Sequence, residues 1–306
     1  MHTFRSELIE GLSADPKTIS PKWLYDAEGS RLFEDITRLD AYYPTRQETA
    51  LLKQTIPLWR EHFGPEAVLV ELGSGASEKT RIVLDGAPEI RAYVPLDISE
   101  SALREAAERL GQDYPDLRIR PLLGDFENLP YLPDDLPTGR RIGFFPGSTI
   151  GNLDREGAVS LMKNVRRILG PNCLFIVGLD LIKDRETLEK AYDDPEGVTA
   201  AFNLNLLVRA NRELRTDFDL SKFAHKAVWN DAKTRIEMHL EAQTDTSVTL
   251  DGERFDFRAG ETLHTESSRK FDREQILSLA REAGWKLMDM RVSTLPNVSL
   301  VLLKPE

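Results

Sequence analysis

The sequence predicts an α/β fold: a parallel, Rossmann-like sheet that is interrupted by an inserted α+β segment. Short apolar runs alternate with segments of helical periodicity between about residues 67 and 182. The first run, Val68–Val70, ends at the glycine turn Gly73-Ser74-Gly75, and a helical segment follows. Continuous Val and Leu residues are typical of a parallel strand buried on both faces, and a glycine turn lets a ligand approach the next helix.

The other elements of this sheet follow in chain order. Further strands are predicted at Arg91–Leu96, Arg118–Leu123, Arg141–Phe145 and Cys173–Ile182. Ser101–Leu110 carries apolar residues at intervals of three and four, which predicts a helix after the second strand. Another helix is predicted from Arg155 to Leu169, where Gly170-Pro171 ends it. Parallel strands in this order need right-handed crossovers.

A different kind of segment follows residue 182. Two helices are predicted, at Arg185–Asp193 and Gly197–Leu214, and then short alternating strands such as Arg235–Glu241. Asp251-Gly252 lies between two such strands and indicates a hairpin turn.

The sheet pattern resumes near the C-terminus. Asp272 is placed to cap a helix that extends to Ala283. The runs Trp285–Val292 and Val298–Leu303 then have the order of antiparallel strands that complete the sheet. We therefore predict a sheet domain into which a second, β-rich domain is inserted.

Composition restricts the function classes. The formal net charge is −11 and long runs of like charge are absent, which disfavours nucleic-acid binding because phosphate contacts need a basic patch. No apolar stretch approaches the roughly 18 residues of a membrane span, and the first residues lack an apolar secretory core. The lone Cys173 and the scattered histidines show no metal-ligand spacing. We expect a cytoplasmic protein without a metal.

The glycine turn alone does not identify its ligand. A dinucleotide site has a third glycine in the pattern G-x-G-x-x-G, and Glu78 occupies that position here. The segment Gly73–Thr80 is one residue away from a phosphate-binding P-loop, and the difference is again Glu78. A tight turn without any ligand is the third alternative.

Acidic residues at successive strand ends narrow the choice. Asp97 ends the second strand, where ribose hydroxyls are received in doubly wound folds. Asp125 follows the third strand beside Phe126, and this pair suits the exocyclic amine and the face of adenine. Each acid alone is consistent with a solvated loop or a helix N-cap. Together with Glu71 at the first strand end, they have the order that S-adenosylmethionine (SAM) requires, which predicts a SAM-dependent methyltransferase.

Polar and aromatic residues outside the sheet carry a family resemblance. Local structure does not require the tyrosines and acids of Pro21–Ser30, Asp40–Arg46 and Ala191–Pro195, although aromatic packing and solvated turns would explain any one of them. With the sheet motifs, they resemble the L-histidine Nα-methyltransferases of ergothioneine biosynthesis over nearly the whole chain. The matching segments are KWLYDAEGSRLFEDI, AYYPTRQE, VELGSGASEKTR, PLDIS, GDF, FPGSTIGNL, AYDDPEGVTAAFN, IEMHL and TESSRKF.

The resemblance implies roles for particular residues. SAM contacts are implied for Gly73, Lys79, Asp97, Asp125 and Phe126. Substrate contacts are implied for Tyr25, Tyr43, Asn152, Tyr192, Met238, Glu266 and Ser268. Tyr43 would lie near the α-amine as the catalytic residue. Asn152 and Tyr192 would hold the carboxylate. Glu266 and Ser268 would contact the imidazole.

The implied reaction is the trimethylation of the α-amino group of L-histidine by SAM, which gives hercynine in the first step of ergothioneine biosynthesis. Residues 61–182 and 270–306 would form the SAM-binding domain, and residues 1–60 and 183–269 the substrate-binding domain. The partners would be histidine and its mono- and dimethylated forms, bound by a monomer that needs no nucleic acid or membrane. The alternatives are a methyltransferase of the same family for another amino acid and a catalytically silent SAM-binding protein.

Overall fold

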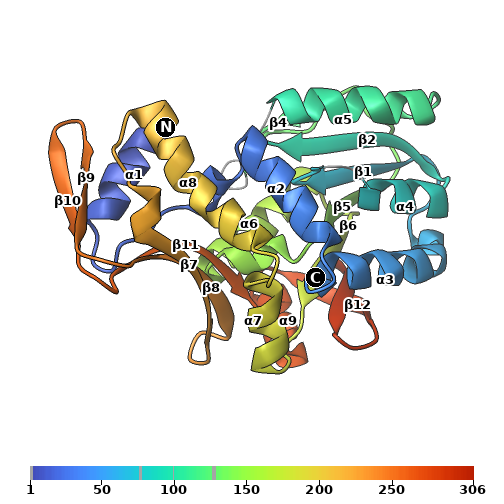
Figure 1. Cartoon of the computed structure of the whole chain (residues 1–306). Coiled ribbons are helices and arrows are strands. Elements are labelled where there is room, and N and C mark those ends of the chain that lie inside the picture. Colours follow the sequence, from blue (N-terminus) through green and yellow to red (C-terminus); the bar gives the residue numbers. More distant parts are fainter. Residues whose placement is uncertain (1–2, 76–77, 99, 126–128) are drawn as a thin grey trace. The chain divides into compact units, whose positions relative to one another are not determined.

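The computed structural model describes residues 3–75, 78–98, 100–125 and 129–306 and divides into two compact units (Figure 1). The large unit consists of Pro44–Ile182 and Lys270–Glu306, and the small unit of Met1–Tyr43 and Lys183–Arg269. The chain therefore passes between the two units three times.

Among the described residues, eight strands of the large unit form one sheet in the order β12-β13-β6-β5-β1-β2-β3, with β4 also paired to β2. Their bounds are β1 Ala67–Leu72, β2 Ile90–Asp97, β3 Arg118–Ile119, β4 Leu122–Leu123, β5 Arg141–Phe145, β6 Leu174–Asp180, β12 Trp285–Val292 and β13 Val298–Pro305. The strands β1 to β6 are parallel, whereas β13 is antiparallel to β6 and β12 to β13. The predicted α/β fold with a mostly parallel sheet is confirmed.

Helices cover both faces of this sheet. Their bounds are α3 Tyr43–Trp59, α4 Glu78–Gly86, α5 Glu100–Asp113, α6 Arg155–Leu169 and α9 Arg273–Glu282, with the 3-10 helices η2 Arg60–His62 and η3 Thr149–Asn152. One face of β1, with Val68 and Val70, shares a core with α6 and α9. Its other face carries Glu71, which bonds to Thr80 of α4. Figure 1 shows α5 alongside β2.

Two elements of the large unit differ from the expectation. The third strand is divided into β3 and β4, because Pro121 between them has no N–H group to donate to the ladder. The segment 44–60 belongs to the large unit and not to the inserted one. Its helix α3 begins at Tyr43-Pro44, since proline is well tolerated in a first helical turn. Trp59 at the other end donates to Asp289 of β12 at 2.8 Å.

The small unit combines helices with two small sheets. Its elements are α1 Phe4–Ser13, η1 Pro21–Leu24, α2 Ala27–Arg38, α7 Arg185–Tyr192, α8 Val198–Leu214, η4 Leu220–Lys222, β7 Phe223–Asn230, β8 Arg235–Ala242, β9 Thr246–Leu250, β10 Glu253–Phe257 and β11 Thr262–Arg269. One sheet has the order β11-β8-β7, and the other is the predicted hairpin β9-β10. Asp251 and Gly252 at its turn both have positive φ, at 55° and 84°, as a tight hairpin turn requires.

The polar run Thr265–Ser268 lies inside β11, a strand that is not among those predicted above. The sequence does not predict this strand, because polar residues occupy both of its faces and apolar and polar residues therefore do not alternate along it. Because a strand fixes the direction of each side chain, β11 determines which of these polar residues share a face.

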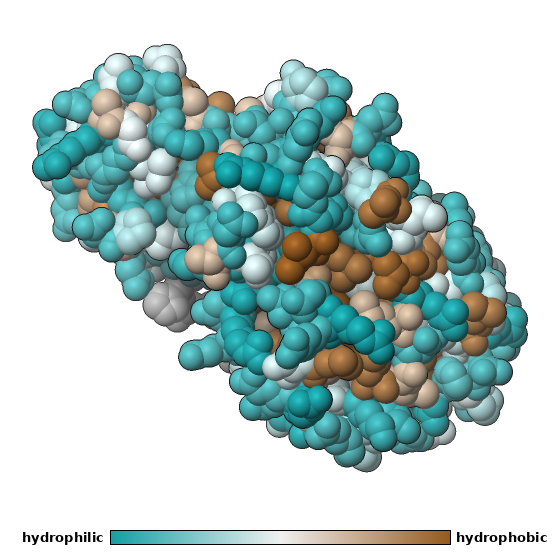
Figure 2. Space-filling model, turned by 90° about the horizontal axis from the view of Figure 1, so that it is seen from below, coloured by the Kyte–Doolittle hydropathy of each residue, from teal (hydrophilic) through white to brown (hydrophobic). Residues whose placement is uncertain are grey.

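The protein surface is mostly hydrophilic on the face drawn in Figure 2, with apolar residues gathered in patches. Exposed apolar side chains of the large unit include Leu58, Val292 and Leu295. Among the described residues, no helix is both long and apolar enough to cross a membrane.

Candidate active site

The glycine turn after β1 leaves room beside the backbone. Gly73 has a φ of +70°, and its N–H donates to the carbonyl of Leu96 at 2.8 Å, which ties the turn to the end of β2. Gly75 also has a positive φ, and among the described residues other than its chain neighbours no atom lies within 4 Å of where its Cβ would be. A ligand can therefore approach this backbone closely, as the sequence predicts.

Glu71 lies beneath this turn and not in the open space beside it. It is buried, and its Oε2 accepts hydrogen bonds from Thr80 Oγ1 at 2.5 Å and from the Tyr93 hydroxyl at 2.6 Å. Burial raises the pKa of this carboxyl to about 7, against the opposing effect of the two hydrogen bonds. The hydrogen bonds of Glu71 therefore link β1 to α4 and β2.

The two predicted acids of the nucleotide site lie at neighbouring strand ends. Asp97 is the last residue of β2 and pairs with Leu123 of β4, and Asp125 follows two residues later. The N–H of Gly124 donates to the carbonyl of Asp97 at 3.1 Å, so the two acidic segments are held together. Both acids are half-buried. Phe126, the predicted adenine contact, lies outside the described residues.

Lys79 has a partner that the sequence reasoning missed. Its Nζ donates to Oε2 of Glu48 at 2.5 Å, and Glu48 itself is only 3% exposed. The N–H of Gly147, after β5, donates to both Glu48 oxygens at 2.8 and 2.9 Å. A Cβ on Gly178 of β6 would lie 1.7 Å from Glu48 Oε1, so only glycine leaves room for the carboxylate. Glu48 thus joins α3, α4 and the loop after β5.

The loop after β5 carries the predicted Asn152. Ser148 there has a left-handed φ of 57°, and its Oγ accepts a hydrogen bond from the N–H of Asp180 at 2.9 Å. The 3-10 helix η3 follows and ends at Asn152, which is half-buried. This geometry fixes the position of Asn152 in the large unit.

The small unit brings most of the predicted substrate residues together. The hydroxyls of Tyr192 and Ser268 are hydrogen-bonded at 2.8 Å, and Glu266 of β11 is paired with Met238 of β8. All of these side chains are buried. Burial, followed by the charges of Glu266, Tyr42 and Tyr192, raises the pKa of Tyr25 well above its usual value, so this phenol stays protonated beside them.

A bulge in β11 decides which residues belong to this cluster. The register with β8 shifts between His264 and Glu266. Ser267 lies between Glu266 and Ser268 on the strand and therefore faces the other way. Its Oγ lies 3.0 Å from Nε2 of His264, on the opposite face of the sheet.

Tyr43, the predicted catalytic residue, is also part of the small unit. It is 2% exposed, and its hydroxyl accepts a hydrogen bond from Lys183 Nζ at 2.7 Å. The predicted site residues thus fall into two groups. Those in the large unit are Gly73, Lys79, Asp97, Asp125 and Asn152, and those in the small unit are Tyr25, Tyr43, Tyr192, Met238, Glu266 and Ser268.

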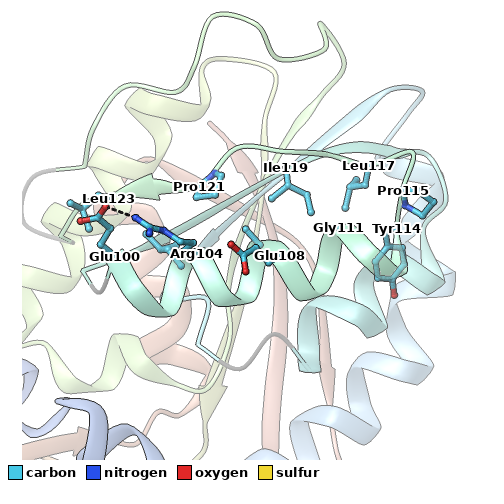
Figure 3. A pocket seen from close by; sticks show the side chains of 12 residues that line it. Glu100, Arg104, Glu108, Gly111, Tyr114, Pro115, Leu117, Ile119, Pro121 and Leu123 are labelled. Carbon is cyan, nitrogen blue, oxygen red and sulfur yellow. Dashed lines mark hydrogen bonds and ion pairs between the residues drawn. The ribbon is translucent and has the colours of Figure 1, made fainter.

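A metal-ligand cluster and a surface groove are the other features that could mark a site. In the part of the chain that the structure describes, no group of three or more His, Cys, Asp or Glu side chains could hold a metal ion. A groove of about 700 Å³ runs along α5 of the large unit (Figure 3). Arg104 and Glu100 form an ion pair at its rim, at 3.2 Å, and none of the predicted site residues lines it.

Comparison with known proteins agrees with this geometry. A family model described as "Histidine-specific methyltransferase, SAM-dependent" matches residues 4–305. The chain belongs to this family. It is therefore a SAM-dependent methyltransferase, and SAM is its methyl donor. The glycine turn after β1, with Asp97 at the end of β2 and Asp125 two residues after β4, is compatible with such a ligand.

Relatives and a solved structure can be compared in more detail. The chain is 45% identical to a histidine N-alpha-methyltransferase of Mycolicibacterium smegmatis, over 92% of this chain and 88% of that one. It is 41% identical to a histidine N-alpha-methyltransferase of Mycobacterium tuberculosis, with the same coverage. A crystal structure of a SAM-dependent methyltransferase from Clostridium acetobutylicum aligns with a TM-score of 0.51 and 14% identity, over 91% of this chain and 98% of that one. That likeness concerns the fold alone.

Proposed function

We propose that this protein transfers three methyl groups from SAM to the α-amine of L-histidine, which gives hercynine and begins ergothioneine biosynthesis. The choice of histidine depends on one observation. The buried carboxylate of Glu266 lies on the same face of β11 as Ser268, whose hydroxyl is hydrogen-bonded to that of Tyr192 in α7. The family and the histidine N-alpha-methyltransferase relatives support the same choice.

The cluster suits a polar, planar ring that carries N–H groups. A buried carboxylate is costly unless it accepts hydrogen bonds, and an imidazole N–H supplies one. The hydroxyl of Ser268 can both donate and accept, so it suits the second ring nitrogen. Met238, the cross-strand neighbour of Glu266, is buried and contributes an apolar wall. An apolar amino acid would leave Glu266 without this partner, and the site would reject it.

The large unit would hold SAM. Asp97 would accept hydrogen bonds from the ribose hydroxyls, and Asp125 from the adenine amine. Lys79, oriented by Glu48, would meet the methionine carboxylate of SAM. SAM supplies the methyl group on a positively charged sulfonium. Asn152 and Tyr192 would hold the histidine carboxylate.

Each transfer is an in-line displacement, so the protein contributes mainly position. The lone pair of the neutral amine forms the new N–C bond while the S–C bond breaks, and the sulfur keeps that electron pair as a neutral thioether. The nitrogen gains the positive charge and must lose a proton before it reacts again. The third transfer leaves a quaternary nitrogen with no proton. In the first two transfers, Tyr43 would accept an N–H of the neutral amine and so turn the nitrogen lone pair toward the methyl group. The neutral dimethylated amine of the third transfer has no N–H left, so its carboxylate and imidazole contacts would position it.

A substitution of Glu266 tests the proposal. Glu266→Ala should raise the KM for histidine about thirty- to hundredfold, because a hydrogen bond to a charged group contributes about 2–3 kcal/mol. The SAM affinity should barely change, since Glu266 lies in the small unit. Discrimination against tryptophan should weaken, because the group that penalised apolar rings is gone. Glu241→Ala on β8, which removes the partner of Lys226, is the control and should behave as wild type.

Histidine kinetics of Glu266→Ala equal to those of wild type would contradict the histidine assignment, and the methyltransferase fold would survive that result. A turnover of tryptophan or tyrosine above that of histidine in the wild type would favour another amino acid as substrate. The reaction needs only small molecules, and a cytoplasmic monomer remains our prediction.

A further inference from the structure

A chain of hydrogen bonds leads from the backbone of Tyr192 into the core of the small unit. Tyr192 is the last residue of α7, so its carbonyl is one of the last four, which have no partner within a helix. This carbonyl accepts a hydrogen bond from Nε2 of His225 on β7 at 2.8 Å. The other ring nitrogen, Nδ1, lies 2.9 Å from Nδ2 of Asn203 on α8. The same Nδ2 donates to the carbonyl of His239 on β8 at 3.0 Å.

Only one protonation state of His225 satisfies these bonds. A carbonyl can only accept, so the Asn203 atom that lies near the carbonyl of His239 must be the amide nitrogen. That nitrogen also donates to Nδ1 of His225, which therefore carries no proton. The carbonyl of Tyr192 likewise requires a proton on Nε2. His225 is thus a neutral imidazole with a fixed tautomer, and its bond to Tyr192 has a fixed direction.

The surroundings of His225 favour the same state. Asn203 is fully buried, and His225 is half-buried. Burial lowers the pKa of His225, against the opposing effect of its bond to the Tyr192 carbonyl. The charges of Asp193 and Asp194 oppose the shift as well. A second proton on the ring would also place Nδ1–H against the amide N–H of Asn203, so the geometry itself disfavours the imidazolium.

His225 lies on the face of the sheet that carries the substrate cluster. Residues two apart on a strand share a face, so His225 is on the same side as Ala227. Ala227 is paired with Met238, which is the cross-strand neighbour of a predicted substrate residue. On this side of the sheet, the hydroxyl of Tyr192 is bonded to that of Ser268 at 2.8 Å. Tyr192 is therefore held at both ends, by its hydroxyl at Ser268 and by its backbone at His225.

We propose that His225 is a positioning residue for the substrate: with Asn203, it fixes the end of α7 and thereby the hydroxyl of Tyr192 that meets the substrate carboxylate. The inference rests on the proposed function, since it takes Tyr192 as a residue that holds this carboxylate. It extends that function to a histidine outside the predicted site and to Asn203, the last residue of the segment AYDDPEGVTAAFN.

Two amide substitutions of equal polarity test this role. The amide nitrogen of His225→Gln can take the place of Nε2 and reach the carbonyl of Tyr192, whereas the shorter side chain of His225→Asn cannot. Calorimetry with the full chain and S-adenosylhomocysteine should show that His225→Asn raises the Kd of L-histidine about tenfold, and that His225→Gln stays within about threefold of wild type. Lys226→Met is the matched control and should bind as wild type, because Lys226 lies on the other face of β7, where it pairs with Glu241.

Histamine separates this role from a general loss of structure, because it lacks the carboxylate and keeps the amine and the imidazole. Its Kd should be the same for wild type and His225→Asn within about twofold, since Tyr192 would not hold it. An equal loss of affinity for histidine and histamine would mean a merely structural role and would overturn the proposal. A histidine Kd of His225→Asn within about twofold of wild type, or a His225→Gln variant as weak as His225→Asn, would also overturn it. A wild-type protein that does not methylate histidine at all would refute the proposed function itself.

Discussion

Glu71 provides a test of the electrostatics beneath the glycine turn. The carboxyl is buried, and its pKa is raised from 4.5 to about 7, chiefly by burial. The unfolded chain ionises this group near its ordinary pKa, whereas the folded protein keeps the proton until about pH 7. Between these pH values the folded state binds more protons, so the free energy of unfolding falls as the pH rises. Glu71→Gln cannot ionise and keeps an oxygen for Thr80 and Tyr93.

The magnitude follows from the two pKa values. A full shift of about 2.5 units is worth about 3.4 kcal/mol, at about 1.4 kcal/mol per unit. About 2.5 kcal/mol of this stabilisation disappears between pH 5 and pH 8. The rest is already gone at pH 5, because the unfolded carboxyl is partly ionised there. The free energy of unfolding of wild type should therefore fall by about 2.5 kcal/mol more than that of Glu71→Gln over this range. The contributions of all other groups cancel in the comparison.

Urea unfolding of both proteins at pH 5 and pH 8, followed by circular dichroism, measures this difference. Glu78→Gln is the control, because Glu78 is an exposed residue of α4 and its substitution should leave the pH dependence of wild type intact. Equal pH dependence of wild type and Glu71→Gln, within about 0.5 kcal/mol, would refute the reasoning and would mean that water reaches the carboxylate.

Three other substitutions test contacts of the large unit. Lys270→Met removes the ammonium that lies 2.8 Å from the carboxylate of the fully buried Asp180. Urea unfolding should show that the free energy of unfolding falls by about 3–5 kcal/mol, and adding Asp180→Asn should restore part of it. A fall of less than about 1 kcal/mol would contradict the buried ion pair. Gly178→Ala places a methyl group where the Glu48 carboxylate lies, so calorimetry should show SAM binding weakened about tenfold, and an unchanged Kd would disprove the coupling. Asp97→Ala should weaken SAM binding about ten- to hundredfold in the same assay. A wild-type Kd for this variant would mean that Asp97 does not contact SAM.

The parts of the molecule that the sequence predicts are those with a local pattern. The apolar run of β1 and its glycine turn follow each other within a short segment, and Asp97 directly ends the next apolar run. The pair Gly170-Pro171 marks the end of α6 in the same local way. Asp272 likewise forms the capping box of α9. These features depend on neighbouring residues, so the sequence displays them directly.

Contacts between residues that are far apart in the chain could not be predicted from the sequence. Glu48 meets Lys79 and Gly147 only because three separate segments converge, and a single sequence does not display that convergence. Its position in the segment AYYPTRQE was the one available hint. The contact of Lys183 with Tyr43 joins residues 140 positions apart. Strand β11 was missed for a different reason, since the residues that suit a substrate replace the apolar side chains that would reveal a strand.

Mass spectrometry of histidine incubated with the protein and SAM tests the central claim most directly. We predict successive gains of one, two and three methyl groups, with the trimethylated form as the final product and fragmentation that locates every methyl on the α-nitrogen. Histidine recovered without a mass gain, or methylated on the imidazole ring, would contradict it.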